Sequence, residues 1–191
     1  MKMKQGIVFL ALLSVYSLPG FSAEMNAGTI HFTGEIISPS CTIAGSSGTD
    51  STVELGVFPT SLFTSTGAES TKNLFSIVLA DCPLTTDGLP AVQLTFNGTT
   101  TLTGSTSLLD VSKITTSGDA AATGVGIAVS PKDADTTLLK FDGTEEQVYI
   151  PLPSTTDDTI RASFYARYKS YSNAVTAGPA DADLTVNILY R

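Results

Sequence analysis

Apolar and polar residues alternate in short segments along most of the chain, and turn-forming residues separate these segments. Alternation with a period of two is typical of β-strands that have one buried face. Because no segment keeps a helical period for long, the pattern predicts an all-β sandwich or barrel in one domain. The predicted strands are residues 29–37, 40–44, 52–57, 74–82, 91–96, 108–111, 124–130, 147–150, 159–168 and 182–190.

Glycine, proline, asparagine and aspartate mark the turns between these strands. The clearest turns are predicted at residues 45–51, 87–90, 97–98 and 142–143. Asn97-Gly98 is interpreted as a hairpin turn rather than as part of a glycosylation sequon. Residues 99–124 are weakly patterned, so their elements cannot be placed from the sequence.

The last predicted strand carries four apolar residues on one face, while Thr185 and Asn187 face the other way. These four residues are Leu184, Val186, Ile188 and Tyr190. The chain stops one residue later, so no hairpin partner is expected after this strand. We therefore expect it either to pair on both sides inside the domain or to keep one open edge.

A complementary pattern occurs near the N-terminus, where Ile30, Phe32 and Ile36 alternate with polar residues. Gly34 occupies the apolar face, where a strand glycine usually marks the close approach of a bulky group. The short spacing to Cys41 leaves this segment little of its own domain to cover it. An open edge and an uncovered strand in one chain favour strand addition between molecules.

The first residues have the layout of a secretory signal. Lys2 and Lys4 precede an uncharged run from residue 6 to residue 18, which is too short to span a bilayer. Residues 1–23 are predicted to form the signal peptide, with cleavage after Ser22 or Ala23. About 170 residues remain, which suits one domain.

Charge and cysteine content restrict the function further. Without Lys2 and Lys4 the chain has 8 basic and 18 acidic side chains, a net charge of −10, which argues against nucleic acid as a partner. The cysteines, Cys41 and Cys82, follow an export signal and are expected to pair in an oxidising compartment. Two free buried thiols are the alternative.

Catalytic and metal-binding patterns are weak. His31, the single histidine, lies on the uncovered strand near the free end, where a rigid catalytic site is not expected. The adjacent acids Glu145-Glu146 and Asp157-Asp158 point to opposite faces if extended, and Asp133 with Asp135 would make a thin calcium shell. A sugar-binding face is a further hypothesis, less favoured than strand packing, for Tyr149, Tyr165, Tyr168 and Tyr171.

Several motifs in order resemble the chaperone–usher pilins, and among them the type 1 fimbrial subunits. The segment 28–36 resembles the N-terminal extension of that family, and Val-Glu-Leu-Gly at 53–56 also matches. Residues 164–168 and 178–190 resemble its C-terminal motif, with a glycine fourteen from the end (Gly178) and a penultimate tyrosine (Tyr190). The resemblance covers the whole chain after the signal.

The resemblance implies a six-stranded, incomplete immunoglobulin-like sandwich that lacks its last strand and contains a Cys41–Cys82 disulfide. Residues 24–37 would form a donor strand and residues 38–191 the pilin domain. The donor residues would be Gly28, Ile30, Phe32, Gly34 and Ile36, each entering a pocket of a neighbour. The acceptor and chaperone-binding residues would be Gly178, Leu184, Val186, Ile188, Tyr190 and Arg191.

The function implied is that of a structural fimbrial subunit, assembled by donor-strand exchange at the outer membrane and supporting cell adhesion. The expected partners are identical or related pilins, a periplasmic chaperone and an outer-membrane usher. No nucleic acid, membrane insertion, cofactor, metal or enzymatic activity is expected. A minor or tip-proximal pilin that binds a host glycan or protein is the alternative, and a secreted β-sandwich hydrolase is a weaker one.

Overall fold

The computed structural model describes residues 29–34, 36, 38, 40–45, 47–86, 88–118, 120–155 and 159–191. The predicted signal peptide and Gly28 lie outside the described residues. The chain divides into two units, Met1–Thr33 and Gly34–Arg191. In the first unit, residues 29–33 form no strand or helix. No helix in the described part is long and apolar enough to span a membrane.

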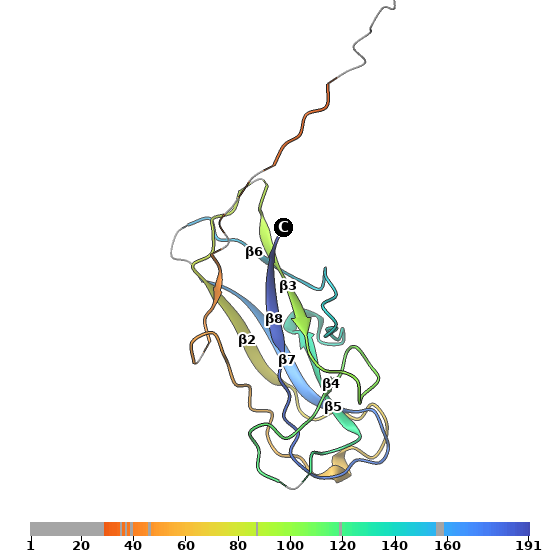
Figure 1. Cartoon of the computed structure of the whole chain (residues 1–191). Coiled ribbons are helices and arrows are strands. Elements are labelled where there is room, and N and C mark those ends of the chain that lie inside the picture. Colours follow the sequence, from red (N-terminus) through yellow and green to blue (C-terminus); the bar gives the residue numbers. More distant parts are fainter. Residues whose placement is uncertain are drawn as a thin grey trace, which may run out of the picture. The chain divides into compact units, whose positions relative to one another are not determined.

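The second unit contains two antiparallel sheets (Figure 1). The larger sheet has the order β1-β2-β7-β5-β4 and the smaller has the order β6-β3-β8. The strands are β1 (Thr42–Ile43), β2 (Asn73–Ala80), β3 (Ala91–Asn97), β4 (Leu109–Asp110), β5 (Val125–Pro131), β6 (Val148–Pro151), β7 (Ile160–Ser170) and β8 (Thr185–Tyr190). Two short 3₁₀ helices, η1 (Thr60–Leu62) and η2 (Lys132–Ala134), lie in the connections.

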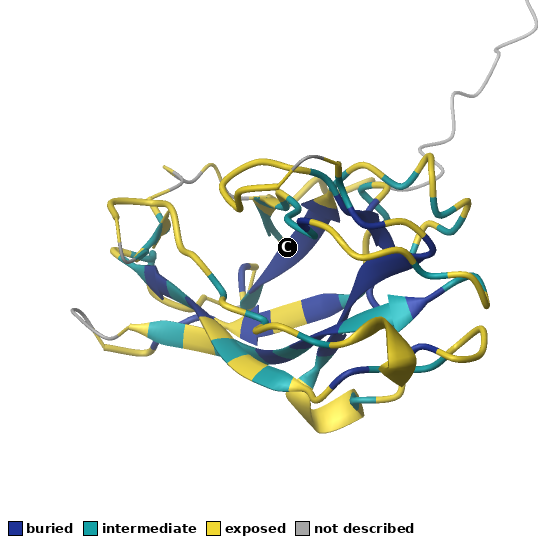
Figure 2. Ribbon diagram, turned by 90° about the horizontal axis from the view of Figure 1, so that it is seen from below, coloured by how far each residue is buried: buried dark blue, intermediate teal, exposed yellow. Residues whose placement is uncertain are grey.

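The apolar faces of the two sheets form one core, and the buried residues lie on strands of both sheets (Figure 2). Leu94 and Phe96 of β3 are buried opposite β7, where Phe164 meets Phe96 edge-to-face at a centroid distance of 5.9 Å. Alternate side chains of each strand therefore supply the core, as the period of two predicted. The described part thus has the predicted all-β, incomplete immunoglobulin-like architecture, with six strands of four or more residues.

Two details of the predicted pattern are wrong, at residues 52–57 and 97–98, and a further predicted strand, 29–37, does not form within the described part of the single chain. Residues 52–57 form no strand, because Gly56 has φ of +92° and the carbonyl of Leu55 accepts from the side chain of Asn73 instead of a ladder partner. The described residues of 29–37 form no strand either. Asn97-Gly98 is no hairpin turn, because the chain crosses from β3 to β4, which pairs with β5 in the other sheet.

The close packing at Gly98 explains why a glycine stands there without a hairpin. A Cβ atom on Gly98 would lie 2.2 Å from a methyl carbon of Leu109, and the amide of Gly98 donates to the carbonyl of Phe141 at 2.9 Å. The glycine is therefore required by a neighbour that is distant in sequence.

A buried ion pair holds the segment around Glu69 against the outer face of the larger sheet. Arg167 of β7 is only 2% exposed, and its Nε donates to Glu69 at 2.7 Å. The Nζ of Lys169 donates to the same carboxylate at 2.6 Å, and Arg167 also donates to Ser130 at 2.9 Å. Glu69 and its neighbours thus hold the segment before β2 against the sheet.

We expect the substitution Glu69→Gln to destabilise the domain by about 1–3 kcal/mol at neutral pH, because it leaves Arg167 buried without a counter-charge. Partial burial raises the pKa of Glu69. The hydrogen bonds and positive charges of Lys169 and Arg167 lower it by more, so the pKa lies below its usual value. A lowered pKa contributes stability that is present above the unfolded-state value and lost as the pH falls through the folded-state value. Urea denaturation across acidic pH checks this, with the exposed Glu54→Gln as control.

Candidate strand-acceptor groove

Strand β8 forms an edge of the smaller sheet. It pairs with β3 from Asn97↔Thr185 to Val92↔Tyr190, and in the described part no strand pairs with its other side. The backbone groups on that side are left without a ladder partner. Of the two outcomes expected from the sequence, the structure shows the open edge.

The side chains of β8 alternate as the sequence predicted. Thr185 and Asn187 are exposed, and Asn187 donates to the side chain of Asn97 at 2.9 Å on the outer face. The four apolar residues pack against the core but stay only partly buried: Leu184, Val186, Ile188 and Tyr190. By contrast, the apolar residues Val92, Leu94 and Phe96 on the paired strand β3 are fully buried.

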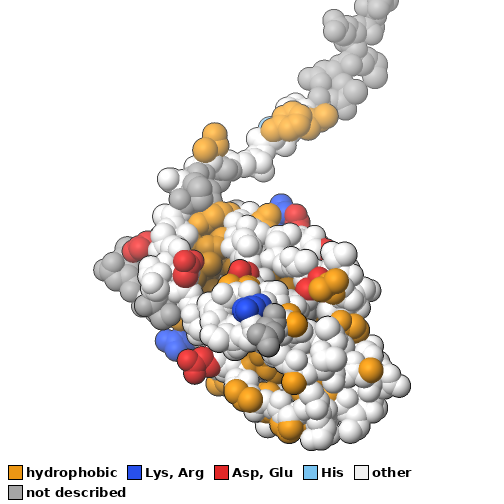
Figure 3. Space-filling view, turned by 60° about the horizontal axis from the view of Figure 1, so that its bottom comes forward, with side chains coloured by type: hydrophobic (Ala, Val, Ile, Leu, Met, Phe, Trp, Pro, Cys, Tyr) orange, Lys and Arg blue, Asp and Glu red, His pale blue; other side chains and the backbone are white. Residues whose placement is uncertain are grey.

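Further partly buried core residues come from the segments before β2 and from the larger sheet. They include Cys41, Ile43, Val53, Leu55 and Phe75. We name these residues, together with Leu184 just before β8 and Val186, Ile188 and Tyr190 of β8, the acceptor groove, because all of them pack against the core and none is fully buried. A band of hydrophobic side chains is visible on the surface of the domain (Figure 3). The core is therefore only partly covered beside β8.

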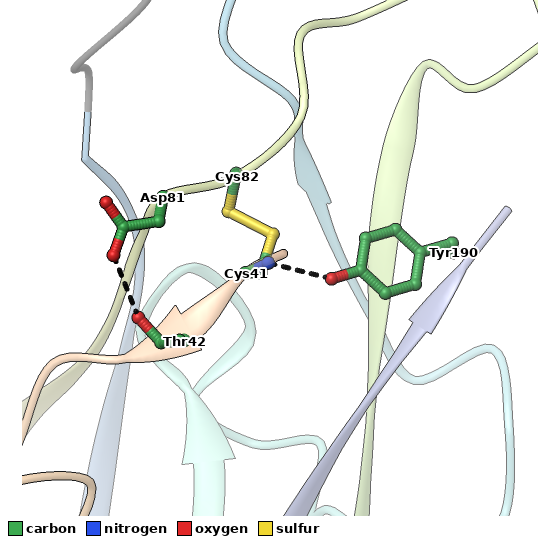
Figure 4. Close-up of a disulfide and its surroundings, with 5 residues drawn as sticks. All are labelled: Cys41, Thr42, Asp81, Cys82 and Tyr190. Atoms are coloured by element: carbon green, nitrogen blue, oxygen red, sulfur yellow. Dashed lines mark hydrogen bonds between the residues drawn. A yellow bond between two sulfur atoms is a disulfide. The ribbon is translucent and has the colours of Figure 1, made fainter. Parts of the chain in front are cut away.

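One end of the groove is fixed by a disulfide and a tyrosine. Cys41 and Cys82 form the predicted disulfide, which joins the residue before β1 to the residues that follow β2. The amide of Cys41 donates to the hydroxyl of Tyr190 at 2.9 Å, so the tyrosine reaches from β8 toward β1 (Figure 4). Asp81 accepts from Thr42 at 3.4 Å beside the disulfide.

Two residues assigned to the acceptor site by resemblance make other contacts in this structure. A Cβ atom on Gly178 would lie 2.2 Å from the carbonyl oxygen of Ala120, so glycine is required there for close backbone packing. The amide of Arg191 donates to the carbonyl of Ala91 at 3.3 Å, and its guanidinium pairs with Glu145. Neither is among the apolar residues that line the groove.

Sequence reasoning missed the residues of the groove that lie outside β8. Ile43, Val53, Leu55 and Phe75 are far from β8 in sequence, and only tertiary structure brings them into one cluster. The alternation in Val53-Glu54-Leu55 was a usable signal, because it marks two apolar side chains on one side of an extended segment.

The candidate donor residues expose their apolar side chains. Ile30 and Phe32 are 79% and 92% exposed, and Ile36 is fully exposed. A Cβ atom on Gly34 would meet no described atom within 4 Å, and its φ lies outside the left-handed region. Neither packing within the described chain nor backbone conformation therefore accounts for the glycine at this position.

The other candidate sites do not assemble. Asp135 pairs with Lys72 at 2.6 Å, and the described residues contain no group of three or more potential metal-ligating side chains. Tyr168 belongs to the core cluster, whereas Tyr149 is half exposed on β6, so the candidate sugar-binding tyrosines do not share a face. The amide of Gly124 donates to the hydroxyl of Tyr171 at 3.3 Å, which gives that tyrosine a structural contact.

Known proteins resemble the chain in sequence and in fold. The family model described as fimbrial protein matches residues 30–191. The fimbrial subunit type 1 of Salmonella typhimurium is 33% identical over 97% of this chain and 94% of its own. The type-1 fimbrial protein A chain of Escherichia coli K12 is 32% identical over 100% of both chains.

Among solved structures, the P pilus rod subunit PapA matches with a TM-score of 0.61 at 24% identity, covering 80% of this chain and 99% of that one. A chaperone–usher pilus structure matches with a TM-score of 0.58 at 23% identity, over 89% and 99% of the two chains. These two similarities concern the fold. The family match and the sequence relatives establish that the chain belongs to the fimbrial protein family and is a structural subunit of a surface pilus.

Proposed function

We propose that the chain polymerises by donor-strand complementation, a form of β-augmentation known among pilins. Residues 24–37 of one subunit would lie along the open edge of β8 in the next. The observation that carries the proposal is the partly buried apolar row of β8 with no strand beside it in the described part. The exposed Ile30, Phe32 and Ile36 supply a matching alternation.

The energetics favour a long-lived joint. Burying each of the three large apolar side chains is worth about 1.5–3 kcal/mol. Each main-chain hydrogen bond formed along β8 would add about 1 kcal/mol. Because these contributions arise together along one strand, the joint should open very slowly.

Before assembly the groove needs another cover, because an uncovered apolar edge is an aggregation hazard. We propose that a periplasmic chaperone supplies a strand to β8 and that the donor segment of the next subunit replaces it at an outer-membrane usher. In this scheme the signal peptide 1–23 directs export, residues 24–37 donate and residues 38–191 accept. The chaperone would bind the carboxylate of Arg191, and Ile36 would start the exchange. No step in this scheme requires catalysis by the chain.

The polymer itself is the test. Purified fimbriae of this chain should run as a ladder of species in SDS that collapses to monomer on heating. Fimbriae that dissociate to monomer in unheated SDS would contradict a joint made by strand insertion. The alternative of a receptor-binding tip pilin is not favoured, because the relatives matched over nearly their whole length are fimbrial subunits.

Gly34 gives a residue-level prediction. We expect Gly34→Leu to slow the formation of the SDS-resistant ladder by about tenfold or more, because the added side chain clashes with the neighbour's groove. The fold should be unaffected, since a Cβ atom at this position meets no described atom. Thr33→Leu is the matched control, because it places the same leucine side chain on the opposite face of the strand. Equal assembly rates of the two variants would count against the donor role of Gly34.

A further inference from the structure

The outer face of the larger sheet is covered at one end and open at the other. Near Arg167 the segment around Glu69 lies over the sheet. Further along this face, Leu74 of β2 pairs with Tyr165 of β7, and the side chain of Leu74 is 57% exposed. Ser76 stands opposite Ser163, with their hydroxyl oxygens 2.9 Å apart. This open face thus combines an exposed large apolar side chain with hydroxyl groups.

A polar hollow of about 400 Å³ adjoins the open face. Lys132 of η2, Tyr149 of β6 and Arg161 of β7 line it, and Asp133 is the one acidic side chain among its lining residues. Ser163 belongs both to the hollow and to the open face. We name the open face and the hollow together the β2–β7 surface.

The two cations of the hollow differ from most others in the domain. Lys72, Arg167, Lys169 and Arg191 each pair with a carboxylate. Lys132 and Arg161 make no ion pair within the described part of the chain, and both are exposed. A guanidinium with free donors beside a half-exposed tyrosine is well suited to bind a carboxylate at an interface.

We propose that the β2–β7 surface binds an acidic patch on a second copy of this chain within the fimbria. Without the predicted signal peptide the chain has 18 acidic and 8 basic side chains, a net charge of −10, so a second copy offers many carboxylates to a locally basic hollow. Assembly into a polymer holds copies at high local concentration, so a contact too weak for free monomers can form between assembled subunits.

This contact is separate from the strand joint. The β2–β7 surface is built from β2, β6, β7 and η2, whereas the strand joint uses β8, which lies at the opposite edge of the smaller sheet from β6. One subunit can therefore use both at once. The proposed contact joins subunits through side chains, and its strength depends on charge. Strand insertion at β8 does not involve Arg161.

Photo-cross-linking in assembled fimbriae tests the proposal. A photo-reactive benzoylphenylalanine at position 149 should attach to an Asp- or Glu-containing peptide of a second copy, identified by mass spectrometry after heating in SDS. We expect Arg161→Glu to reduce the cross-link yield by about tenfold, because it places like charges together. Lys113→Glu is the matched control. Lys113 is also exposed and makes no ion pair within the described part, and its replacement by glutamate changes the net charge by the same amount.

Two further measurements, the salt dependence of the cross-link and the SDS ladder of the variant, separate this contact from the strand joint. Raising NaCl from about 0.05 M to about 0.5 M should lower the cross-link yield of the parent chain, because it screens the contact. The unheated SDS ladder of Arg161→Glu should remain, which shows that the variant folds and makes strand joints. A ladder with no cross-link, a cross-link to another protein or to an apolar peptide, or equal yields in the two charge variants would overturn the proposal. Loss of the ladder in the parent chain would instead contradict strand insertion.

Discussion

A chain that lacks residues 24–37 will fold and accept a strand but will not donate one. Deletion removes all the apolar side chains that alternate along the segment, Ile30, Phe32 and Ile36. At about 1.5–3 kcal/mol each, their loss weakens the joint by about three orders of magnitude or more. The acceptor groove, built from β8 and the residues around β1 and β2, remains intact.

The measurement is co-assembly of the deleted chain with the parent chain. We expect the deleted chain to sit only at one end of each polymer, so that the average SDS-resistant ladder shortens as its proportion rises. A full-length control replaces His31 and Thr33 by serine, because these side chains alternate with the apolar ones and should tolerate the change. Finding the deleted chain between two other subunits would contradict the donor role.

Loss of the disulfide should have the largest effect on the stability of the single subunit. The bond between Cys41 and Cys82 closes a loop with a sequence separation of 41. By the chain-entropy relation, replacing both cysteines by serine should cost about 4 kcal/mol of unfolding free energy. Urea denaturation of the double variant beside the parent chain measures this loss.

The effect should reach the acceptor groove as well as the overall fold. Cys41 directly precedes β1, and its amide donates to Tyr190, so freeing Cys41 loosens both sides of one end of the groove. We therefore expect slower ladder formation by the double variant. A reducing agent should lower the stability of the parent chain but leave that of the double variant unchanged. Equal stability of parent and variant would contradict a structural role for the bond.

Local patterns revealed much of this architecture. The alternation of Leu184, Val186, Ile188 and Tyr190 predicted one strand and the face that it turns toward the core. That prediction succeeded because a period of two follows from strand geometry and depends little on distant residues. The cysteine pairing could also be predicted without knowledge of the packing, because it follows from the predicted export to an oxidising compartment.

The errors arose where distant residues decide the local conformation. Gly98 is explained by contact with Leu109, and residues 52–57 are held by the side chain of Asn73, so neither position follows the local pattern. The buried pair of Glu69 and Arg167 joins residues separated by 98 positions, and no nearby motif announces it. The residues of the groove outside β8 were missed for the same reason.

The edges of the two sheets differ in a way that bears on the form of the polymer. β1 and β4, at the ends of the larger sheet, have two residues each. β6, opposite β8 in the smaller sheet, has four residues and ends in Pro151, which has no amide hydrogen to donate. Within the described part, β8 is the one edge strand long enough to accept a donor along several residues. A monomer with one donor and one acceptor is bifunctional, so strand insertion gives a linear polymer without branches. The length of that polymer depends on the supply of subunits and on any chain that accepts a strand but donates none.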